Sequence, residues 1–306
     1  MNSAPAQIRV QDMDVTLPEG VGWTALVTAY ARAQESRRPD RLFNDVWARA
    51  VIAQATRTRL DGAGLPAADG GSFWNDLASY AVIRTPFYDE HVRLGVADGC
   101  RQVVLLAAGF DGRAQRLDLP ASTTVFELDT APVLDFKNAA LHTEGAAGPL
   151  VVARRTVATD LRGDWPAALR EAGFDPTRPT VWLAEGLLMY LDSTECDQLL
   201  DNITALSAPG SRFVTEWSER NPAGEQSLVG YPDETERRAG ELLGSLFRSG
   251  PAVSPQEWLD RHGWHSYEID HLGARYRRHD RTTPWVYDPR HPQGLLVHLV
   301  AGIRRP

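Results

Sequence analysis

The sequence predicts an α/β protein built on a doubly wound, mostly parallel sheet. Three observations carry this prediction. Short apolar runs, typical of strands buried on both faces, alternate along the chain with stretches of helical period. One such run, residues 103–106, leads directly into a turn of small residues around Gly109, and the next apolar run ends at Asp129. Gly109 precedes Asp129 by 20 residues, a spacing that nucleotide-binding folds of this class share.

Composition limits the classes of protein to which the chain can belong. Its 306 residues suffice for one large α/β domain or two smaller ones, and 43% hydrophobic residues can form a sizeable core. A net charge of -8 argues against a nucleic-acid partner, which requires a basic face. Cys100 and Cys196 are too few for a disulfide framework or a metal cluster. Because the chain shows no signal peptide and no membrane-spanning run, we expect a cytoplasmic protein without a membrane partner.

The N-terminal part predicts helices that cover the sheet. Apolar residues recur at helical spacing over residues 23–54, with a charged cluster at 35–40 between two helices. A loop rich in Gly, Ala and Pro follows at 61–72. We therefore predict an N-terminal helical cap of residues 1–98 and a core domain of residues 99–306.

A proline interrupts the next helical stretch. The pattern predicts a helix over residues 74–83 that ends before Pro86, because proline lacks the amide that continues a helix. Thr85 as N-cap, with Pro86 in the first helical position, would then start a second helix that ends near residue 97. Arg84 would lie at the break, where it could reach a ligand carboxylate or remain a surface arginine.

The core sequence predicts seven strands connected mostly by helices. The strands are expected at residues 103–106, 125–129, 150–157, 180–184, 212–217, 264–270 and 295–303. Helices are expected at residues 113–117, 131–143, 167–172 and 234–247, after a capping box at Asp192, and after an N-cap at Ser254. The polar segment 218–253 predicts a lid. The arginine-rich piece 275–278 indicates a solvated edge or a contact for an anionic substrate.

Acids stand at the ends of three predicted strands. Asp129 can accept hydrogen bonds from ribose hydroxyls. Asp160 can accept one from an adenine amino group, or it can simply form an Asx turn. Glu185 follows a buried strand and precedes Gly186 and large apolar residues, which indicates the floor of a pocket.

The turn after the first strand does not decide which nucleotide the protein binds. Ala107-x-Gly109-x-x-Gly112 differs by one methyl group from the dinucleotide fingerprint. On this turn alone, NAD and S-adenosylmethionine cannot be separated. A turn that only packs a helix against a strand is the structural alternative.

Six segments together resemble a known family, the class I S-adenosylmethionine-dependent methyltransferases of the leucine carboxyl methyltransferase type. This group includes actinobacterial proteins and polyketide O-methyltransferases, and the resemblance implies their Rossmann-like fold. The family's turn reads GAGxDTR, from which Ala107 and Gly112 depart, and Ala107 adds a methyl group where the cofactor's methionine portion passes. The matching segments, in the family's order and spacing, are residues 37–48, 84–85, 103–117, 125–137, 157–169 and 182–191.

The resemblance implies residues that bind the methionine portion of S-adenosylmethionine and of its product, S-adenosylhomocysteine. Arg84 would grip the carboxylate, and Glu185 would lie near the amino group. The turn from Ala107 to Gly109 would lie under the methionine and the ribose.

The resemblance also implies residues for the nucleoside portion. Asp129 would hold the ribose hydroxyls. Asp160 would bind the adenine amino group, and the backbone of Leu161 would face the adenine ring.

The implied reaction is O-methylation of a carboxylate or a phenolic hydroxyl on a small molecule, of the polyketide type made in secondary metabolism. A carboxylate is ionised at neutral pH and needs no base, whereas a hydroxyl needs one. Tyr190, Glu216 and a histidine of the final third are candidates for that base. No metal is expected, and the sequence gives no signal for an oligomeric state.

Two other functions remain open from the sequence. An NAD(P)-dependent oxidoreductase would explain the near-match at the glycine turn, but it gives no role to the segments at Asp160 and Glu185. A non-catalytic protein that binds S-adenosylmethionine would keep the same fold without transferring a methyl group.

Overall fold

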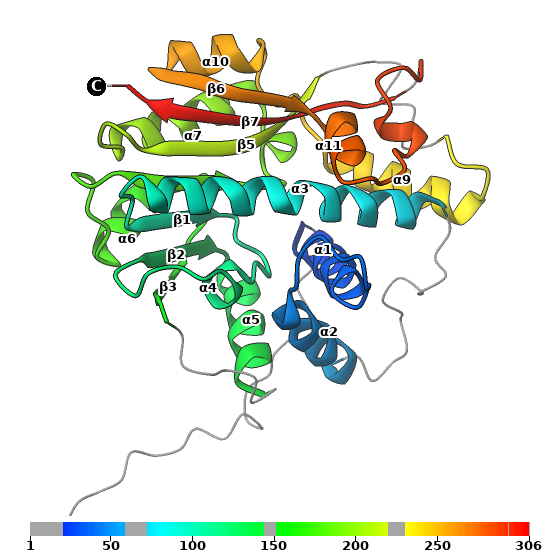
Figure 1. Cartoon of the computed structure of the whole chain (residues 1–306), viewed down its shortest axis with the longest axis horizontal. Helices are drawn as coiled ribbons and strands as arrows, with labels where there is room; N and C mark the ends of the chain where they lie inside the picture. Colours follow the sequence, from blue (N-terminus) through cyan, green and yellow to red (C-terminus); the bar gives the residue numbers. More distant parts are fainter. Residues whose placement is uncertain (1–20, 59–71, 144–150, 220–229, 293, 306) are drawn as a thin grey trace, which may run out of the picture.

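The computed structural model describes residues 21–58, 72–143, 151–219, 230–292 and 294–305, and its centre is a single seven-stranded sheet (Figure 1). The strands are β1 (Gln102–Leu106), β2 (Thr124–Asp129), β3 (Ala153–Ala158), β4 (Thr180–Ala184), β5 (Arg212–Glu219), β6 (Trp264–His271) and β7 (Leu296–Arg304). Their order is β3-β2-β1-β4-β5-β7-β6, and only β7 runs antiparallel to its neighbours. The predicted fold class is confirmed.

Helices cover both faces of the sheet. They are α1 (Val21–Glu35), α2 (Val46–Thr58), α3 (Ser72–Ala97), α4 (Arg113–Arg116), α5 (Ala131–Thr143), α6 (Trp165–Glu171), α7 (Ser193–Ala205), α9 (Glu234–Leu246), α10 (Pro255–Arg261) and α11 (Leu272–Arg278), with 3-10 turns η2 (Leu188–Tyr190) and η4 (Trp285–Tyr287). In β1, Val103 and Leu105 pack into one core with α3, while Val104 and Leu106 pack into a second core with α6, α7 and α10. Burial on both faces explains why the central strands β1 and β4 are mostly apolar.

The predicted break at Pro86 is wrong, because α3 is one helix that runs across the sheet (Figure 1). Proline inside a helix costs about 3 kcal/mol. The side chains of Phe87, Tyr88 and Val92 are fully buried, and burial stabilises by about 1.5–3 kcal/mol for each large apolar side chain. Packing against the sheet therefore outweighs the local rule, and Arg84 lies inside the helix.

The C-terminal part contains a partial correction. The expected solvated edge at residues 275–278 belongs to α11, where Arg277 and Arg278 are exposed but Arg275 is only 1% exposed. Its Nε lies 2.7 Å from a carboxylate oxygen of Asp270. By contrast, the capping box at Asp192 and the N-cap at Ser254 are confirmed.

Some expectations are not tested by the fold. The predicted loop at 61–72 lies almost wholly outside the described residues, as does part of the expected lid at 218–253. The division into a cap of residues 1–98 and a core of residues 99–306 stays a prediction. Among the helices that the structure describes, none is both long and apolar enough to span a bilayer.

Candidate functional site

A cavity of about 530 Å³ lies at the carboxyl ends of the central strands. β1 stands between β2 and β4 at the point where the strand order reverses, which is where open α/β sheets bind ligands. α1, α3 and the end of α9 contribute the remaining walls. The cavity is lined by all seven predicted cofactor-binding residues: Arg84, Ala107, Gly109, Asp129, Asp160, Leu161 and Glu185.

Asp129 connects the turn after β1 to the end of β2. Its Oδ2 accepts a hydrogen bond of 2.7 Å from the Gly109 amide, and its Oδ1 accepts one of 2.7 Å from the Thr130 amide. Burial raises the pKa of Asp129, and these hydrogen bonds oppose the rise. Ala107 has a φ of 49°, a left-handed conformation that costs an L-residue about 1–2 kcal/mol.

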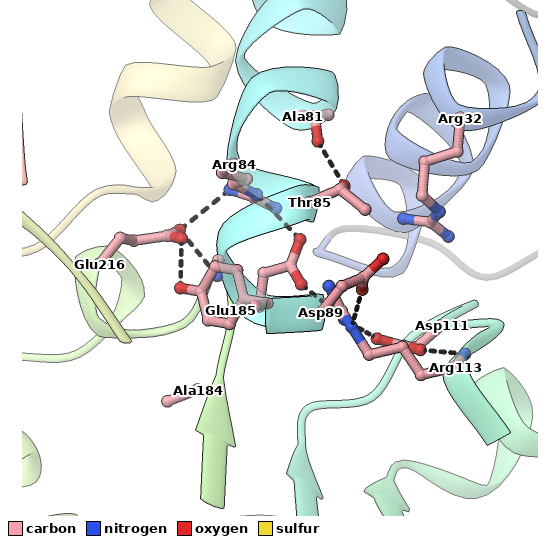
Figure 2. A network of polar contacts seen from close by, with 12 residues as sticks. Arg32, Ala81, Arg84, Thr85, Asp89, Asp111, Arg113, Ala184, Glu185 and Glu216 are labelled. Atoms are coloured by element: carbon pink, nitrogen blue, oxygen red, sulfur yellow. Dashed lines mark hydrogen bonds and ion pairs between the residues drawn. The ribbon is translucent and has the colours of Figure 1, made fainter. Parts of the chain in front are cut away.

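Arg84 projects from α3 between two glutamates (Figure 2). Its Nε donates to Glu185 Oε1 at 3.0 Å and its Nη1 donates to Glu216 Oε1 at 2.9 Å. Its Nη2 makes no hydrogen bond to any residue that the structure describes, and the side chain lines the cavity. A charged donor is therefore available to a ligand carboxylate.

Glu185 at the end of β4 is held from both sides by cations. Its Oε2 lies 2.8 Å from Arg113 Nη1, opposite the contact with Arg84. Burial raises the pKa of Glu185, but Arg113 and Arg84 together outweigh it and the pKa falls below its ordinary value. Gly186 has a φ of 68°, and a Cβ there would lie 3.1 Å from Arg84 Nη2, so this position requires glycine.

Glu216 was expected to be a candidate base, but the structure does not place it in the cavity wall. Its Oε1 accepts hydrogen bonds from the Tyr80 hydroxyl, Arg84 and the Gly186 amide, and its Oε2 accepts one from the Tyr88 hydroxyl. The side chain is fully buried. A base must reach the proton that it removes, so Glu216 instead positions Arg84 and the turn after β4.

Tyr190, the other named candidate base, does line the cavity. Burial raises the pKa of its hydroxyl, and its ring packs against Phe247 with ring centroids 5.6 Å apart. A phenol with a raised pKa is a poor base at neutral pH, because little of it is ionised.

Asp160 lies at the more exposed end of the cavity. Its carboxylate accepts hydrogen bonds from the backbone amide and the guanidinium of Arg162, the first at 2.9 Å. The hydrogen bonds from Arg162 lower the pKa of Asp160. The Asx-type turn that the sequence allowed is therefore present, and Asp160 and Leu161 still face the cavity.

Sequence reasoning missed a set of buried charges beside Glu185. Arg113 donates to Asp89 at 2.8 Å and also contacts Asp111 (Figure 2). The charge of Arg113 overcomes the effect of burial and lowers the pKa of Asp111 to about 2. Asp111 and Arg113 match the Asp and Arg of the family's turn, GAGxDTR, and could have been found from it. No sequence pattern marked Asp89 on α3.

The departure from the family pattern at Gly112 has a steric reason. A Cβ at Gly112 would lie 2.7 Å from Asp45 Oδ1. Asp45 is fully buried and receives a hydrogen bond of 3.0 Å from Arg32 Nε. The absence of a side chain at residue 112 lets this ion pair approach the turn.

The residues present fit a nucleotide-sized cofactor with an amino-acid end. A volume of about 530 Å³ is within the range of small-molecule sites. The available Nη2 of Arg84 suits a carboxylate, and Asp129 at the end of β2 suits ribose hydroxyls. These roles, and those of Asp160, Leu161 and Glu185, remain proposals.

Comparison with known sequences points to one family. The model of the leucine carboxyl methyltransferase family matches residues 25–204. A protein of Mycobacteroides abscessus named "putative S-adenosyl-L-methionine-dependent methyltransferase" is 43% identical over 252 residues, which cover 80% of this chain and 82% of that protein. A protein of the same description from Mycolicibacterium smegmatis is 43% identical over 256 residues, with 81% and 84% covered.

Solved structures share the fold at low sequence identity. A duf574 family protein from Streptomyces avermitilis has a TM-score of 0.54 and 12% identity, with 92% of this chain and 97% of that chain covered. A Thermobifida fusca structure described as a "putative methyltransferase" has a TM-score of 0.51 and 18% identity, with 92% and 94% covered.

Proposed function

The chain belongs to the leucine carboxyl methyltransferase family and is an S-adenosylmethionine-dependent methyltransferase, and on this premise we propose that it methylates a carboxylate oxygen of a small molecule. Membership of this family identifies the cofactor as S-adenosylmethionine, which the glycine turn alone could not distinguish from NAD. It also confirms the expected family and cofactor. A small acid of secondary metabolism, such as one of polyketide type, is the expected acceptor.

The cofactor supplies an electrophilic methyl group on a sulfonium, and the chain supplies its position. Arg84 binds the carboxylate end, Asp129 binds the ribose, and Asp160 with Leu161 binds the adenine. Glu185 accepts from the amino group. Because buried ion pairs fix Arg84 and Glu185 and hydrogen bonds fix Asp129 and Asp160, most of the rate enhancement comes from alignment and exclusion of water.

One observation supports a carboxylate over a hydroxyl: the described lining of the cavity contains no free base. It includes no histidine, lysine or cysteine. Each acid in it, namely Asp111, Asp129, Asp160, Glu185 and Glu195, is already hydrogen-bonded to a cation or to backbone amides. A carboxylate acceptor needs no proton removed, so this lining suits it.

A phenolic hydroxyl is the second candidate acceptor, and one pair of residues favours it. Burial raises the pKa of Asp76 to about 6, and its Oδ2 accepts a hydrogen bond of 2.9 Å from the Tyr231 hydroxyl. Asp76 could take a proton through Tyr231. Phenol methylation would then increase as the pH rises through 6, whereas carboxylate methylation would not.

Methyl transfer from labelled S-adenosylmethionine to panels of carboxylic acids and phenols tests the proposal. Mild base releases labelled methanol from methyl esters and leaves methyl ethers intact. We expect base-labile label with at least one acid and a flat pH dependence between 6 and 8. Base-stable label alone, formed faster as the pH rises through 6, would show that the hydroxyl is the acceptor.

A further inference from the structure

A small chamber of about 40 Å³ lies beside the main cavity, beneath α9. The two spaces share Leu77, Tyr80, Met189, Leu243 and Phe247, which therefore lie between them. The rest of the described chamber wall is mainly aliphatic and aromatic: Phe73, Ser218, Tyr231, Val286, Tyr287, Leu295 and Val297. A lining of this kind binds an apolar group.

The chamber lies away from the proposed nucleoside site. Asp160 and Leu161 line the main cavity but not the chamber. Leu161 borders a different hollow, which it forms with Glu195 and other residues of α7. The chamber is therefore free for the acceptor when the nucleoside occupies its own end.

Tyr287 lines the chamber and has a free hydroxyl. Of the other tyrosines that line it, Tyr80 donates to Glu216 at 2.8 Å and Tyr231 donates to Asp76 at 2.9 Å. The Tyr287 hydroxyl makes no hydrogen bond to the described residues, although the residue as a whole is only 6% exposed. A hydroxyl at the wall of a cavity can donate to a ligand oxygen.

Tyr287 also lies near the part of the site assigned to the methionine portion. Its ring stacks on Tyr80 with centroids 5.4 Å apart and an interplanar angle of 26°. The guanidinium of Arg84 lies 4.4 Å from the Tyr80 ring centroid on that ring's face. Burial raises the pKa of Tyr287, so the hydroxyl stays protonated and can donate.

We propose that the chamber binds the apolar body of a compact carboxylic acid, and that the Tyr287 hydroxyl donates to one oxygen of its carboxylate. The inference rests on the proposed carboxyl methylation. A volume of about 40 Å³ holds about three waters. This admits a short branched group of about three carbons and excludes an aromatic ring.

The second carboxylate oxygen is left for the reaction. Its lone pair forms the new O–CH₃ bond as the C–S bond breaks and the electron pair of that bond goes to sulfur. The carboxylate anion becomes a neutral methyl ester and the sulfonium becomes a thioether. No proton moves, so Tyr287 keeps its own.

Calorimetry on the protein saturated with S-adenosylhomocysteine tests the chamber without relying on turnover. The probes are isovalerate, as a compact acid with a branched three-carbon end, and phenylacetate, as an acid with an aromatic ring. The variants are Tyr287→Phe and, as matched control, Tyr276→Phe. Tyr276 stacks on Tyr287, but its hydroxyl bonds to Ser79 and it does not line the chamber.

We expect isovalerate to bind the wild type and Tyr276→Phe equally, and Tyr287→Phe at least about tenfold more weakly, as for the loss of one hydrogen bond to a charged group. Equal binding of isovalerate by Tyr287→Phe, tighter binding of phenylacetate, or no binding of isovalerate would overturn the inference. If the expected pattern appears but no acid yields a methyl ester, the proposed function fails while the chamber stands. If methyl esters form but the expected binding pattern is absent, the proposed function stands and the chamber is not the acceptor site.

Discussion

The two walls of the cavity differ in chemistry and in their position along the chain. The wall at the ends of β1, β2 and β4 contains the buried ion pairs of Arg84, Arg113 and Glu185 and lies within residues 25–204, which the family model matches. The chamber is apolar and aromatic, and most of its lining lies beyond residue 204. We therefore assign donor binding to the part that the family model matches, and acceptor choice to the C-terminal third.

Acids near the two walls also titrate differently. Beside the ion-paired wall, the pKa of Asp111 falls to about 2 and that of Glu185 falls below its ordinary value, because arginines outweigh the effect of burial. Near the chamber, burial raises the pKa of Asp76 to about 6 and also raises that of Glu216. Arginines therefore keep Asp111 and Glu185 charged, whereas burial disfavours the charged form of Asp76 and Glu216.

Glu216 lies between the two regions, and its loss has the largest expected effect. Glu216→Ala leaves Arg84 and two tyrosine hydroxyls without their buried acceptor. We expect the free energy of unfolding, measured by urea denaturation, to fall by about 3–5 kcal/mol. Glu234→Ala is the control, because its ion pair with Arg238 is exposed and should contribute at most about 0.5 kcal/mol. Equal effects would refute the role of Glu216.

Leu295→Phe separates acceptor binding from donor binding. Leu295 is half-buried and lines the chamber but not the main cavity. Added bulk in a packed space costs about 1–3 kcal/mol, so the KM for a compact acid should rise about tenfold while the Kd for S-adenosylhomocysteine stays unchanged. Leu242→Phe, at an exposed position of α9, is the control. A parallel loss of both affinities would contradict the separation.

Asp76→Asn tests the electrostatics beside the chamber. Because the folded-state pKa is about 6 instead of 3.8, the folded protein binds more protons in that window, and stability falls as the pH rises through it. Asn mimics the neutral acid, and after allowance for partial exposure the variant should be about 1 kcal/mol more stable at pH 7.5. The gain should vanish near pH 4. Urea denaturation at both pH values measures it, and a variant less stable than the wild type at pH 7.5 would contradict the assignment.

Asp160→Ala should have the smallest effect. The carboxylate is half-exposed and already bonded to Arg162. We expect the Kd for S-adenosylhomocysteine to rise about two- to fivefold, as for one solvent-accessible hydrogen bond. A loss of affinity for S-adenosylhomocysteine as large as that expected for a buried hydrogen bond would mean that the adenine lies deeper than proposed.

Much of the ion-paired wall was predictable from sequence, and the reason is geometric. Apolar runs marked the strands, and parallel strands end at one edge of a sheet, so Asp129, Asp160 and Glu185 were expected to converge. Gly109 was predicted with them, because it precedes Asp129 by 20 residues, the spacing that nucleotide-binding folds of this class share. The periodicity of the residues and the order of the motifs carry this information.

The chamber could not be predicted, because its lining comes from distant segments. Phe73, Tyr231 and Tyr287 meet there although no local pattern connects them. The contact between Arg84 and Glu216 joins residues 132 positions apart. At Pro86 the local rule gave the wrong answer, since burial against the sheet outweighed it.

Calorimetric titration with S-adenosylhomocysteine tests the central claim, that the cavity at the ends of β1, β2 and β4 holds the methyl donor. The wild type should bind one equivalent, and Asp129→Ala should bind at least about 100-fold more weakly, because two hydrogen bonds to a half-buried carboxylate are lost. Asp129→Asn, which keeps an acceptor for the Gly109 amide, controls for damage to the turn. No heat with the wild type, or unchanged affinity in Asp129→Ala, would contradict the account.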